Sequence, residues 1–451
     1  MLKVYSTLHR GIVPFEPRNE GKVSMYVCGP TVQSEPHVGH GRSAVAFDVI
    51  RRYLTWSGYD VTFVRNITDI EDKIIAAAEE AGESVETLAR EMGKRFEDAF
   101  VGLGVLSPDF EPMATKHIDE IITLTEVLIE RGLAYVRDGD VYFSVRTLES
   151  YGKLSGRNPD DLRSGHRIEV DESKDDPLDF AVWKSAKPGE PWWESPWGPG
   201  RPGWHIEGSG MGEKDLGRDF DIHGGGSDLM FPHHENEIAQ SEGASGTTFA
   251  RYWLHNGMVN LGGEKMAKST GLVVDLASIL ESHGGRALRM LYLRAHYRSP
   301  IEYSEVLLGE ATEALDRLDR FRQRATPGVP DEIALDRLRE VMDDDFGTPQ
   351  AISLLFDLVR EGNRLLDEGG DGSAIAGAVE TIVSILGLDD ALDPAAEEPA
   401  LTDSEVDALV AERNQARSER RFDDADAIRD ELEDQGVSLE DGPNGTRWLR
   451  K

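Results

Sequence analysis

Strand and helix patterns alternate along the first quarter of the chain, and this alternation limits the fold more than any other feature. Residues 24–28 read as a short buried strand, 41–56 as an amphipathic helix and 61–65 as a second strand, followed by a helix rich in Ala and Glu to about Arg95. Such alternation is typical of a doubly wound parallel sheet, whose ligands bind at the carboxyl ends of the strands. The sequence therefore predicts an α/β fold with its site at that edge.

Two histidines lie where the first strand leads into the first helix, in the segment His37-Val38-Gly39-His40. A helix start offers unpaired N–H groups and the positive end of the macrodipole, and both stabilise an anion. Gly39 lets a nucleotide approach the backbone closely. A tetrapeptide of this kind also recurs by chance and can simply fill a turn. Its position after a strand favours a phosphate site.

A second cationic segment lies far along the chain, where Lys265 and Lys268 stand between glycines at positions 262, 263 and 271. The chain uses Lys sparingly and prefers Arg, so two lysines three residues apart stand out from an ordinary solvated loop. A mobile loop with two cations can close on a pyrophosphate as charge develops on it. The pair of segments suggests an enzyme that activates a substrate with ATP.

These segments carry a family resemblance. Residues 37–40 resemble the "HIGH" signature and residues 265–269 the "KMSKS" signature of class I aminoacyl-tRNA synthetases. Further segments resemble cysteinyl-tRNA synthetases in order and separation: 26–32 (YVCGPTV), 65–70 (RNITDI), 203–207 (GWHIE), 221–228 (DIHGGGSD) and 231–237 (FPHHENE). The resemblance runs from near Val4 to Trp448 and thus covers essentially the whole chain.

The resemblance implies a division into domains. We expect an α/β Rossmann-type catalytic domain with an insertion, then an α-helical bundle and a small α+β C-terminal domain. The expected boundaries are 1–117 and 200–257 for the two catalytic halves, 118–199 for the insertion, 258–303 for the lysine-loop and stem-contact region, 304–388 for the bundle, 389–399 for a linker and 400–451 for the anticodon-binding domain. A length of 451 residues independently predicts several domains.

Cysteine content and hydropathy predict a cytosolic protein. The only cysteine is Cys28, so no intramolecular disulfide can form, which fits a reducing compartment. No apolar run is long enough to span a bilayer, and the N-terminus lacks the pattern of a signal peptide. No membrane partner is therefore expected. The family is commonly monomeric, and no heptad pattern argues otherwise.

The formal net charge of −35 is unexpected for a protein that would bind tRNA. An acidic, Lys-poor surface is one way to stay hydrated in concentrated salt, where a Debye length of about 3 Å at 1 M screens self-repulsion. We therefore infer a halophilic source. In that setting, tRNA recognition should rely on shape and base contacts more than on bulk charge.

The metal ligands are the most unusual part of the sequence. His233 and Glu237 stand four apart on an expected helix after Pro232, so one face could bind one ion, and Cys28 would add a thiolate. The resemblance implies a zinc ion held by two cysteines, a histidine and a glutamate, which takes the substrate thiolate and so allows serine to be rejected.

The second cysteine of that set is replaced by Gly208, which offers no ligand. Three protein ligands still suit a site that keeps a position open, so we favour a weakened zinc site over no metal. Other residues that could substitute are His205, Glu207, Ser209 and His234. Alternatively, Cys28 is a buried small hydrophobe and His233 simply hydrogen-bonds Glu237.

The resemblance also implies the chemistry, which is ligation of L-cysteine to tRNA(Cys) through cysteinyl-adenylate, with Mg²⁺ accompanying ATP. The implied catalytic residues are His37, His40, Lys265 and Lys268; the ATP-binding residues Thr31, Gly39, Gly225, Asp228 and Lys268; and the amino-acid-binding residues Gly29, Thr68 and Trp204. Gln33 and Ala267 depart from the family pattern without removing a group that the chemistry needs.

Two other functions remain open. A related enzyme that joins activated cysteine to an amino sugar would keep the ATP signatures but needs no C-terminal module such as residues 400–451. A duplicated synthetase that serves as an RNA-binding or regulatory protein would explain the loss at Gly208, although the intact histidines and lysines oppose it.

Overall fold

The computed structural model describes residues 1–161, 174–262, 264–265, 274–389, 403–435, 437–442 and 445–450. The chain divides into two compact units, Met1–Leu392 and Asp393–Lys451. Lys268 and most of the expected linker lie outside the described residues. Among the helices that the structure describes, none combines the length and hydropathy needed to cross a membrane.

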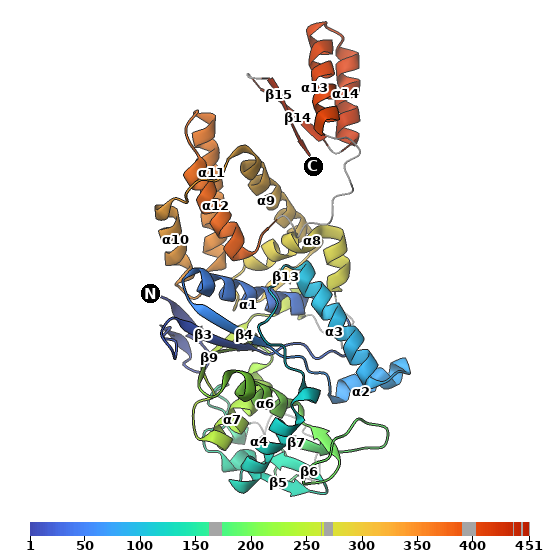
Figure 1. Ribbon diagram of the computed structural model, residues 1–451, viewed down its shortest axis with the longest axis vertical. Coiled ribbons are helices and arrows are strands. Elements are labelled where there is room, and N and C mark those ends of the chain that lie inside the picture. The colour runs from blue at the N-terminus through green and yellow to red at the C-terminus, as the bar shows by residue number, and fades with distance from the viewer. Residues whose placement is uncertain are drawn as a thin grey trace. The chain divides into compact units, whose positions relative to one another are not determined.

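The first unit is built on a four-stranded sheet in the order β10-β9-β3-β4, with every neighbouring pair parallel. Its strands are β3 (Lys22–Val27), β4 (Asp60–Arg65), β9 (Phe220–Gly226) and β10 (Ala250–Asn256). Helix α1 (Val38–Trp56) covers one face, and α6 (Trp204–Leu216) and α7 (Glu235–Ser245) cover the other (Figure 1). Helices on both faces explain why these strands are buried along most of their length. The expected doubly wound parallel sheet is confirmed.

Two boundaries near the first strands differ from the expectation. Helix α1 begins at Val38 rather than residue 41, with His37 as its N-cap, so His40 lies within the first helical turn. The single helix expected after β4 is two helices, α2 (Asp72–Ala81) and α3 (Val85–Gly102). Gly82 ends α2 in the left-handed region at φ 72°, and the Ser84 side chain accepts from the Thr87 N–H to begin α3.

A separate antiparallel sheet interrupts the parallel one. It follows α4 (Ile118–Glu130) and has the order β5-β6-β7-β8, formed by β5 (Ala134–Arg137), β6 (Asp140–Phe143), β7 (Phe180–Ser185) and β8 (Gly200–Pro202). It shares a core with α4 and the helices α6 and α7, in which Ile121, Val141 and Trp183 are fully buried. This packing fixes the start of α6 beside the parallel sheet.

The remaining elements of the first unit are two small sheets and a group of helices. The strands are β1 (Lys3–Ser6), β2 (Gly11–Pro14), β11 (Val259–Leu261), β12 (Glu264–Lys265) and β13 (Ile301–Tyr303); the helices are α8 (Leu276–Leu293), α9 (Glu305–Arg324), α10 (Glu332–Met342), α11 (Thr348–Asp367) and α12 (Ser373–Leu386). Helices α9 to α12 lie within residues 304–388, where the α-helical bundle was expected.

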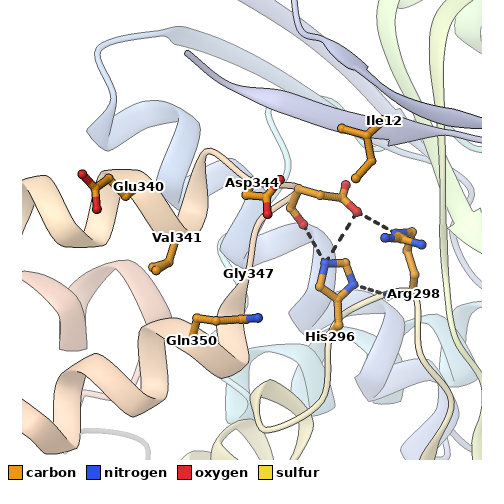
Figure 2. A pocket seen from close by; sticks show the side chains of 9 residues that line it. Ile12, His296, Arg298, Glu340, Val341, Asp344, Gly347 and Gln350 are labelled. Carbon is orange, nitrogen blue, oxygen red and sulfur yellow. Dashed lines mark hydrogen bonds and ion pairs between the residues drawn. The ribbon is translucent and has the colours of Figure 1, made fainter.

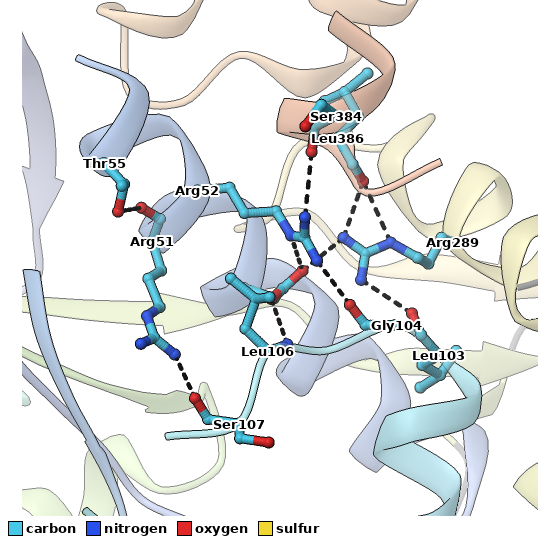
Figure 3. Close-up of polar contacts among 11 residues, drawn as sticks. Arg51, Arg52, Thr55, Leu103, Gly104, Leu106, Ser107, Arg289, Ser384 and Leu386 are labelled. Carbon is cyan, nitrogen blue, oxygen red and sulfur yellow. Dashed lines mark hydrogen bonds and ion pairs between the residues drawn. The ribbon is translucent and has the colours of Figure 1, made fainter. Parts of the chain in front are cut away.

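A buried ion pair joins α1 to α8. The Asp48 carboxylate accepts from Arg289 at 2.6 Å and from Arg52 at 2.8 Å, and the Asp48 and Arg289 side chains are both 0% exposed. Figure 3 shows Arg289 and Arg52 also reaching the carbonyl groups of Leu386 and Ser384 at the end of α12. The pair therefore ties the helix that carries His37 and His40 to the helical part of the unit.

The second unit contains α13 (Asp403–Ser418), α14 (Phe422–Asp434) and a hairpin of β14 (Val437–Gly442) and β15 (Gly445–Arg450). Val406, Val410, Leu432 and Val437 form its core, and Ile428 packs against them. Phe422, the first residue of α14, is 58% exposed and does not belong to this core.

Candidate active site

The segment of residues 37–40, which we call the histidine turn, is held by a reciprocal pair of backbone contacts. The Gly39 N–H donates to His37 Nδ1, and the His37 N–H donates to His40 Nδ1, both at 3.1 Å. The two rings stack with centroids 3.7 Å apart. Because each Nδ1 accepts a hydrogen bond, each neutral ring carries its proton on Nε2. Both histidines are thereby set as Nε2–H donors at a helix N-terminus, which suits a phosphate.

Residues expected at the amino-acid and ATP subsites meet at the carboxyl ends of β3 and β4. Thr31 and Thr68 pair in a parallel bridge, and the Thr68 N–H donates to the Pro30 carbonyl at 3.1 Å. The Gly29 N–H donates to Asn66 Oδ1 at 2.9 Å, and a Cβ at Gly29 would lie 1.7 Å from the Asn66 carbonyl oxygen. Only glycine fits at this crossing of two chain segments.

The neighbouring strand β9 brings Gly225 and Asp228 to the same edge of the sheet. A Cβ at Gly225 would lie 2.9 Å from Cε1 of the His234 ring, so the strand passes close to the turn before α7. Asp228 lies two residues after the end of β9. The edge therefore collects residues from β3, β4 and β9, as a parallel sheet requires.

Trp204 begins α6, and its ring lies 4.3 Å from the ring of His233, centroid to centroid. His233 is not in α7, which begins at Glu235, but in the preceding turn Met230–His234. His233 Nε2 nevertheless lies 3.1 Å from Glu237 Oε1, as the i, i+4 spacing predicts. Its Nδ1 is 2.9 Å from Nδ1 of His205.

Four side chains that could bind a metal ion lie close together near these residues, and we call them the donor cluster. Its ligand atoms all lie within 4.8 Å of one another and come from Cys28, His223, His234 and Glu237. The Cys28 thiol donates to Glu237 Oε1 at 3.6 Å, and His223 Nε2 lies 2.7 Å from Glu237 Oε2. One sulfur, two imidazole nitrogens and a carboxylate are donors that zinc accepts. The residues present therefore fit a zinc ion.

Charge within the donor cluster is unevenly distributed. Burial alone would raise the pKa of the Glu237 carboxyl, but His223 and His233 outweigh it and hold the pKa well below its usual value. Burial, and then the Glu237 carboxylate, raises the pKa of the Cys28 thiol well above its usual value. Burial, and then His223, lowers the pKa of His234 well below its usual value. The cluster thus holds an ionised carboxylate beside a neutral thiol and a neutral imidazole.

Gly208 leaves the space that the Glu237 carboxylate occupies. A Cβ at position 208 would stand 1.9 Å from Glu237 Oε1, far inside contact distance. The carboxylate has therefore entered space that any side chain on Gly208 would fill. Of the other residues considered as substitute ligands, His234 belongs to the cluster, whereas Ser209 Oγ donates to the Glu237 carbonyl and His205 faces His233.

His223 is the one member of the donor cluster that sequence reasoning did not select. It lies in β9, and the pairing of β9 with β3 sets it against Tyr26, two residues before Cys28. The signal available in the sequence was a histidine directly between Ile222 and three consecutive glycines. His233, which was selected, contacts Glu237 but is not among the four converging donors.

The lysine loop is described only in part. The backbone of Lys265 pairs with Asn260 in the small sheet of β11 and β12. Lys268, predicted to stabilise pyrophosphate, lies outside the described residues. The structure does bring Asp275, which caps α8, beside His37 through an antiparallel bridge. The described chain thus resumes after the loop next to the histidine turn.

A hollow elsewhere in the first unit does not involve the predicted site. Figure 2 shows it between β2, the segment after α8, the end of α10 and the start of α11. It is lined by Ile12, His296, Arg298, Glu340, Val341, Asp344, Asp345, Gly347 and Gln350. Asp345 accepts from Arg298 Nε at 2.6 Å and from the Tyr297 hydroxyl at 2.9 Å. These contacts stabilise the fold locally.

Three domain families match this chain in order. Residues 14–313 match the tRNA synthetases class I (C) catalytic domain, 337–388 the DALR domain and 399–448 the cysteinyl-tRNA ligase anticodon binding domain. A cysteine–tRNA ligase of Methylobacillus flagellatus is 50% identical, and one of Alkalilimnicola ehrlichii 51% identical, each over 100% of both chains.

Among solved structures, methionyl-tRNA synthetase of Mycobacterium tuberculosis in complex with methionyl-adenylate is similar in fold. Its TM-score is 0.59 at 18% identity, over 86% of this chain and 94% of that one. At that identity the likeness concerns the fold alone. The relatives matched over their full length and the three domain matches, in contrast, are specific: the chain belongs to the cysteine–tRNA ligase family of class I synthetases.

Proposed function

We propose that this chain ligates L-cysteine to tRNA(Cys) in two steps. The cysteine carboxylate attacks the α-phosphorus of ATP, which gives cysteinyl-adenylate and releases pyrophosphate. The terminal ribose of the tRNA then attacks the activated carbonyl, through its 2′-hydroxyl as class I enzymes do, and AMP leaves. The observation that carries the proposal is identity of about half over the full length of cysteine–tRNA ligases.

The histidine turn supports the first step. His37 and His40 would donate from Nε2 to phosphate oxygens as charge moves from the α-phosphorus to the leaving pyrophosphate. Lys265, Lys268 and Mg²⁺ would balance the pyrophosphate, and Thr31 and Gly39 would lie against the phosphates. Gly225 and Asp228 would hold the nucleoside, and Gly29, Thr68 and Trp204 would line the amino-acid pocket.

Zinc is proposed as the resident metal. Cys28 and Glu237 belong both to the ligand set that the family resemblance implies and to the donor cluster, and His233 is the third residue of the implied set. A bound zinc ion would supply a Lewis acid with affinity for a thiolate over a hydroxyl. This chain's own residues hold the site: Glu237 stays ionised between two histidines, and Trp204 packs on His233.

We also propose roles for the other regions of the chain, an oligomeric state and a cellular compartment. We assign residues 118–199 to the insertion, 258–303 to stem contacts, 304–388 to the bundle and 400–451 to anticodon binding, with a monomeric, cytoplasmic enzyme. The match of residues 399–448 to an anticodon-binding family argues against an amino-sugar ligase.

Charging of a tRNA(Cys) transcript with labelled cysteine tests the proposed function. We expect ATP-dependent charging with cysteine and none with a tRNA of another anticodon. Loss of charging in the variant lacking residues 400–451, with cysteine-dependent pyrophosphate exchange retained, would separate recognition from activation. Absence of both activities in the folded wild-type chain would instead support a non-catalytic duplicate.

Salt adaptation is proposed from the net charge of −35. Self-repulsion of the acidic surface should weaken as the Debye length falls from about 10 Å at 0.1 M to about 3 Å at 1 M salt. The free energy of unfolding should therefore rise over that range of KCl. Stability that is flat or falls with KCl would rule out this adaptation.

A further inference from the structure

The donor cluster holds more buried nitrogen and oxygen donors than its protein contacts satisfy. Both ring nitrogens of His223, Nε2 of His234 and Oε2 of Glu237 are buried without an aligned hydrogen-bond partner among the described residues, although His223 Nε2 and Glu237 Oε2 are only 2.7 Å apart. His223, His234 and Glu237 are each 0% exposed. Buried polar groups without aligned partners are costly. His223, His234 and Glu237 each contribute one ligand atom to a group that lies within 4.8 Å, and this indicates a missing ligand that they share.

Two neighbours prepare His234 to bind a metal. Its Nδ1 lies 2.8 Å from Nε2 of His255, whose Nδ1 lies 2.7 Å from Oγ1 of Thr7. When His234 Nδ1 donates to His255 and His255 Nδ1 donates to Thr7, the Nε2 lone pair of His234 is left to face the cluster. A hydrogen bond from the second ring nitrogen is the usual support of a metal-ligating histidine.

The position of Glu237 beside Gly208 sets which of its oxygens lies near each histidine. With Oε1 of Glu237 1.9 Å from the place of a Cβ on residue 208, its other oxygen, Oε2, lies 2.7 Å from His223 Nε2. His233 instead has Nδ1 against His205 and Nε2 against Glu237 Oε1. His233 is thus placed to orient Glu237, while His223 and His234 converge with Cys28 on one volume.

We propose that this chain compensates for Gly208 by binding its zinc ion through Cys28, His223, His234 and Glu237, with His233 as a positioning residue for Glu237. The proposal rests on the zinc assignment of the proposed function and replaces its third ligand. Zinc bonds of about 2.0–2.3 Å place tetrahedral ligands roughly 3.3–3.7 Å apart, so donors within 4.8 Å need only small side-chain shifts.

Metal binding by full-length variants tests this assignment. Zinc content after dialysis would be measured by elemental analysis, and the Co²⁺-substituted protein would be examined for its d–d bands and its thiolate-to-cobalt charge-transfer band. The variants are His223→Gln, His234→Gln and His233→Gln, with His283→Gln as a control histidine in α8, remote in sequence from the cluster. Circular dichroism of each metal-free protein checks folding.

We expect wild-type protein to hold about one zinc, and His223→Gln and His234→Gln each to lose affinity by more than about 100-fold and to change the d–d bands. His233→Gln should lose no more than the roughly 10–100-fold typical of an outer partner and should keep the band pattern. Metal loss in His233→Gln alone, with His223→Gln and His234→Gln unchanged, would overturn the ligand set. Wild-type protein that holds no metal would also overturn the ligand set. Cysteine-dependent exchange by that metal-free protein would still support the ligase function.

Discussion

The histidine turn and the donor cluster lie at the same edge of one sheet but are stabilised in different ways. In the histidine turn, backbone N–H groups at the start of α1 fix both rings. In the donor cluster, buried side chains fix one another, and several donor atoms remain without an aligned partner among the described residues. The histidine turn holds both histidines for which a phosphate role is proposed. In the donor cluster, the Glu237 carboxylate occupies space that a side chain at Gly208 would fill.

The largest effect should follow from removing the buried ion pair between Asp48 of α1 and Arg289 of α8. Asp48→Asn leaves Arg289 buried and uncompensated, so the free energy of unfolding should fall by about 3–5 kcal/mol, measured by urea denaturation. The exposed pair Arg364–Glu368 provides the control, since Arg364→Gln should cost less than about 1 kcal/mol. Equal costs for the two variants would contradict a special role for the Asp48 pair.

The contribution of the Asp48–Arg289 pair to the free energy of unfolding should depend on pH. Burial would raise the pKa of Asp48, but Arg289 and Arg52 outweigh it, so the folded-state pKa lies below the unfolded value of about 3.9. Its stabilisation is therefore present above about pH 4 and is lost as pH falls through the folded-state pKa. The difference in unfolding free energy between wild type and Asp48→Asn should shrink in that acid range.

Next in size is the loss of a phosphate donor. His40→Ala should lower cysteine-dependent ATP–pyrophosphate exchange by about 10²–10³-fold, because a positioned donor to developing charge is removed. The zinc content should not change, since His40 is not part of the donor cluster. If His40→Ala also lost zinc, the two sites would not be independent.

A smaller effect should come from adding one methyl group at Gly208. Gly208→Ala must push the Glu237 carboxylate away, and zinc affinity should fall by about 10–100-fold. Gly93→Ala is the matched control, since a Cβ at this glycine in α3 meets nothing within 4 Å. Competition with a chromogenic chelator would measure both; unchanged affinity in Gly208→Ala would show that Glu237 is not a ligand.

The smallest effect should come from the support behind His234. Thr7→Val removes the hydroxyl that lies 2.7 Å from His255 Nδ1. One hydrogen bond is worth about 0.5–1.5 kcal/mol, so zinc affinity should fall by about 2- to 10-fold. Exchange activity measured at saturating zinc should be retained. A larger loss of affinity than in Gly208→Ala would mean that the support of His234 matters more to the metal than the placement of Glu237.

Local patterns predicted one site more fully than the other. The alternation of strands and helices and the N-terminal position of His37 predicted the parallel sheet and the histidine turn, because both depend on neighbouring residues. The meeting of His233 with Glu237 was also predicted from their spacing. The place of His223 was not, because it depends on the pairing of β9 with β3 across distant parts of the chain.

Only part of the role of Gly208 could be predicted from the sequence. Its lack of a ligand was evident, but the entry of Glu237 into the vacated space depends on how α6 packs against α7. The break between α2 and α3 was similarly missed, although Gly82 and Ser84 carry its signal. Packing between elements, rather than propensity within them, decided these points.

The most direct test is ATP–pyrophosphate exchange in high salt, with cysteine and with serine, on protein whose zinc content is known. If the histidine turn binds phosphate and the donor cluster binds zinc, exchange with cysteine should be fast at about one zinc per chain. Exchange with serine should rise as zinc is removed. Equal rejection of serine by zinc-free protein would contradict a metal role in selecting the thiol. Absence of exchange with either amino acid would contradict the proposed ligase function.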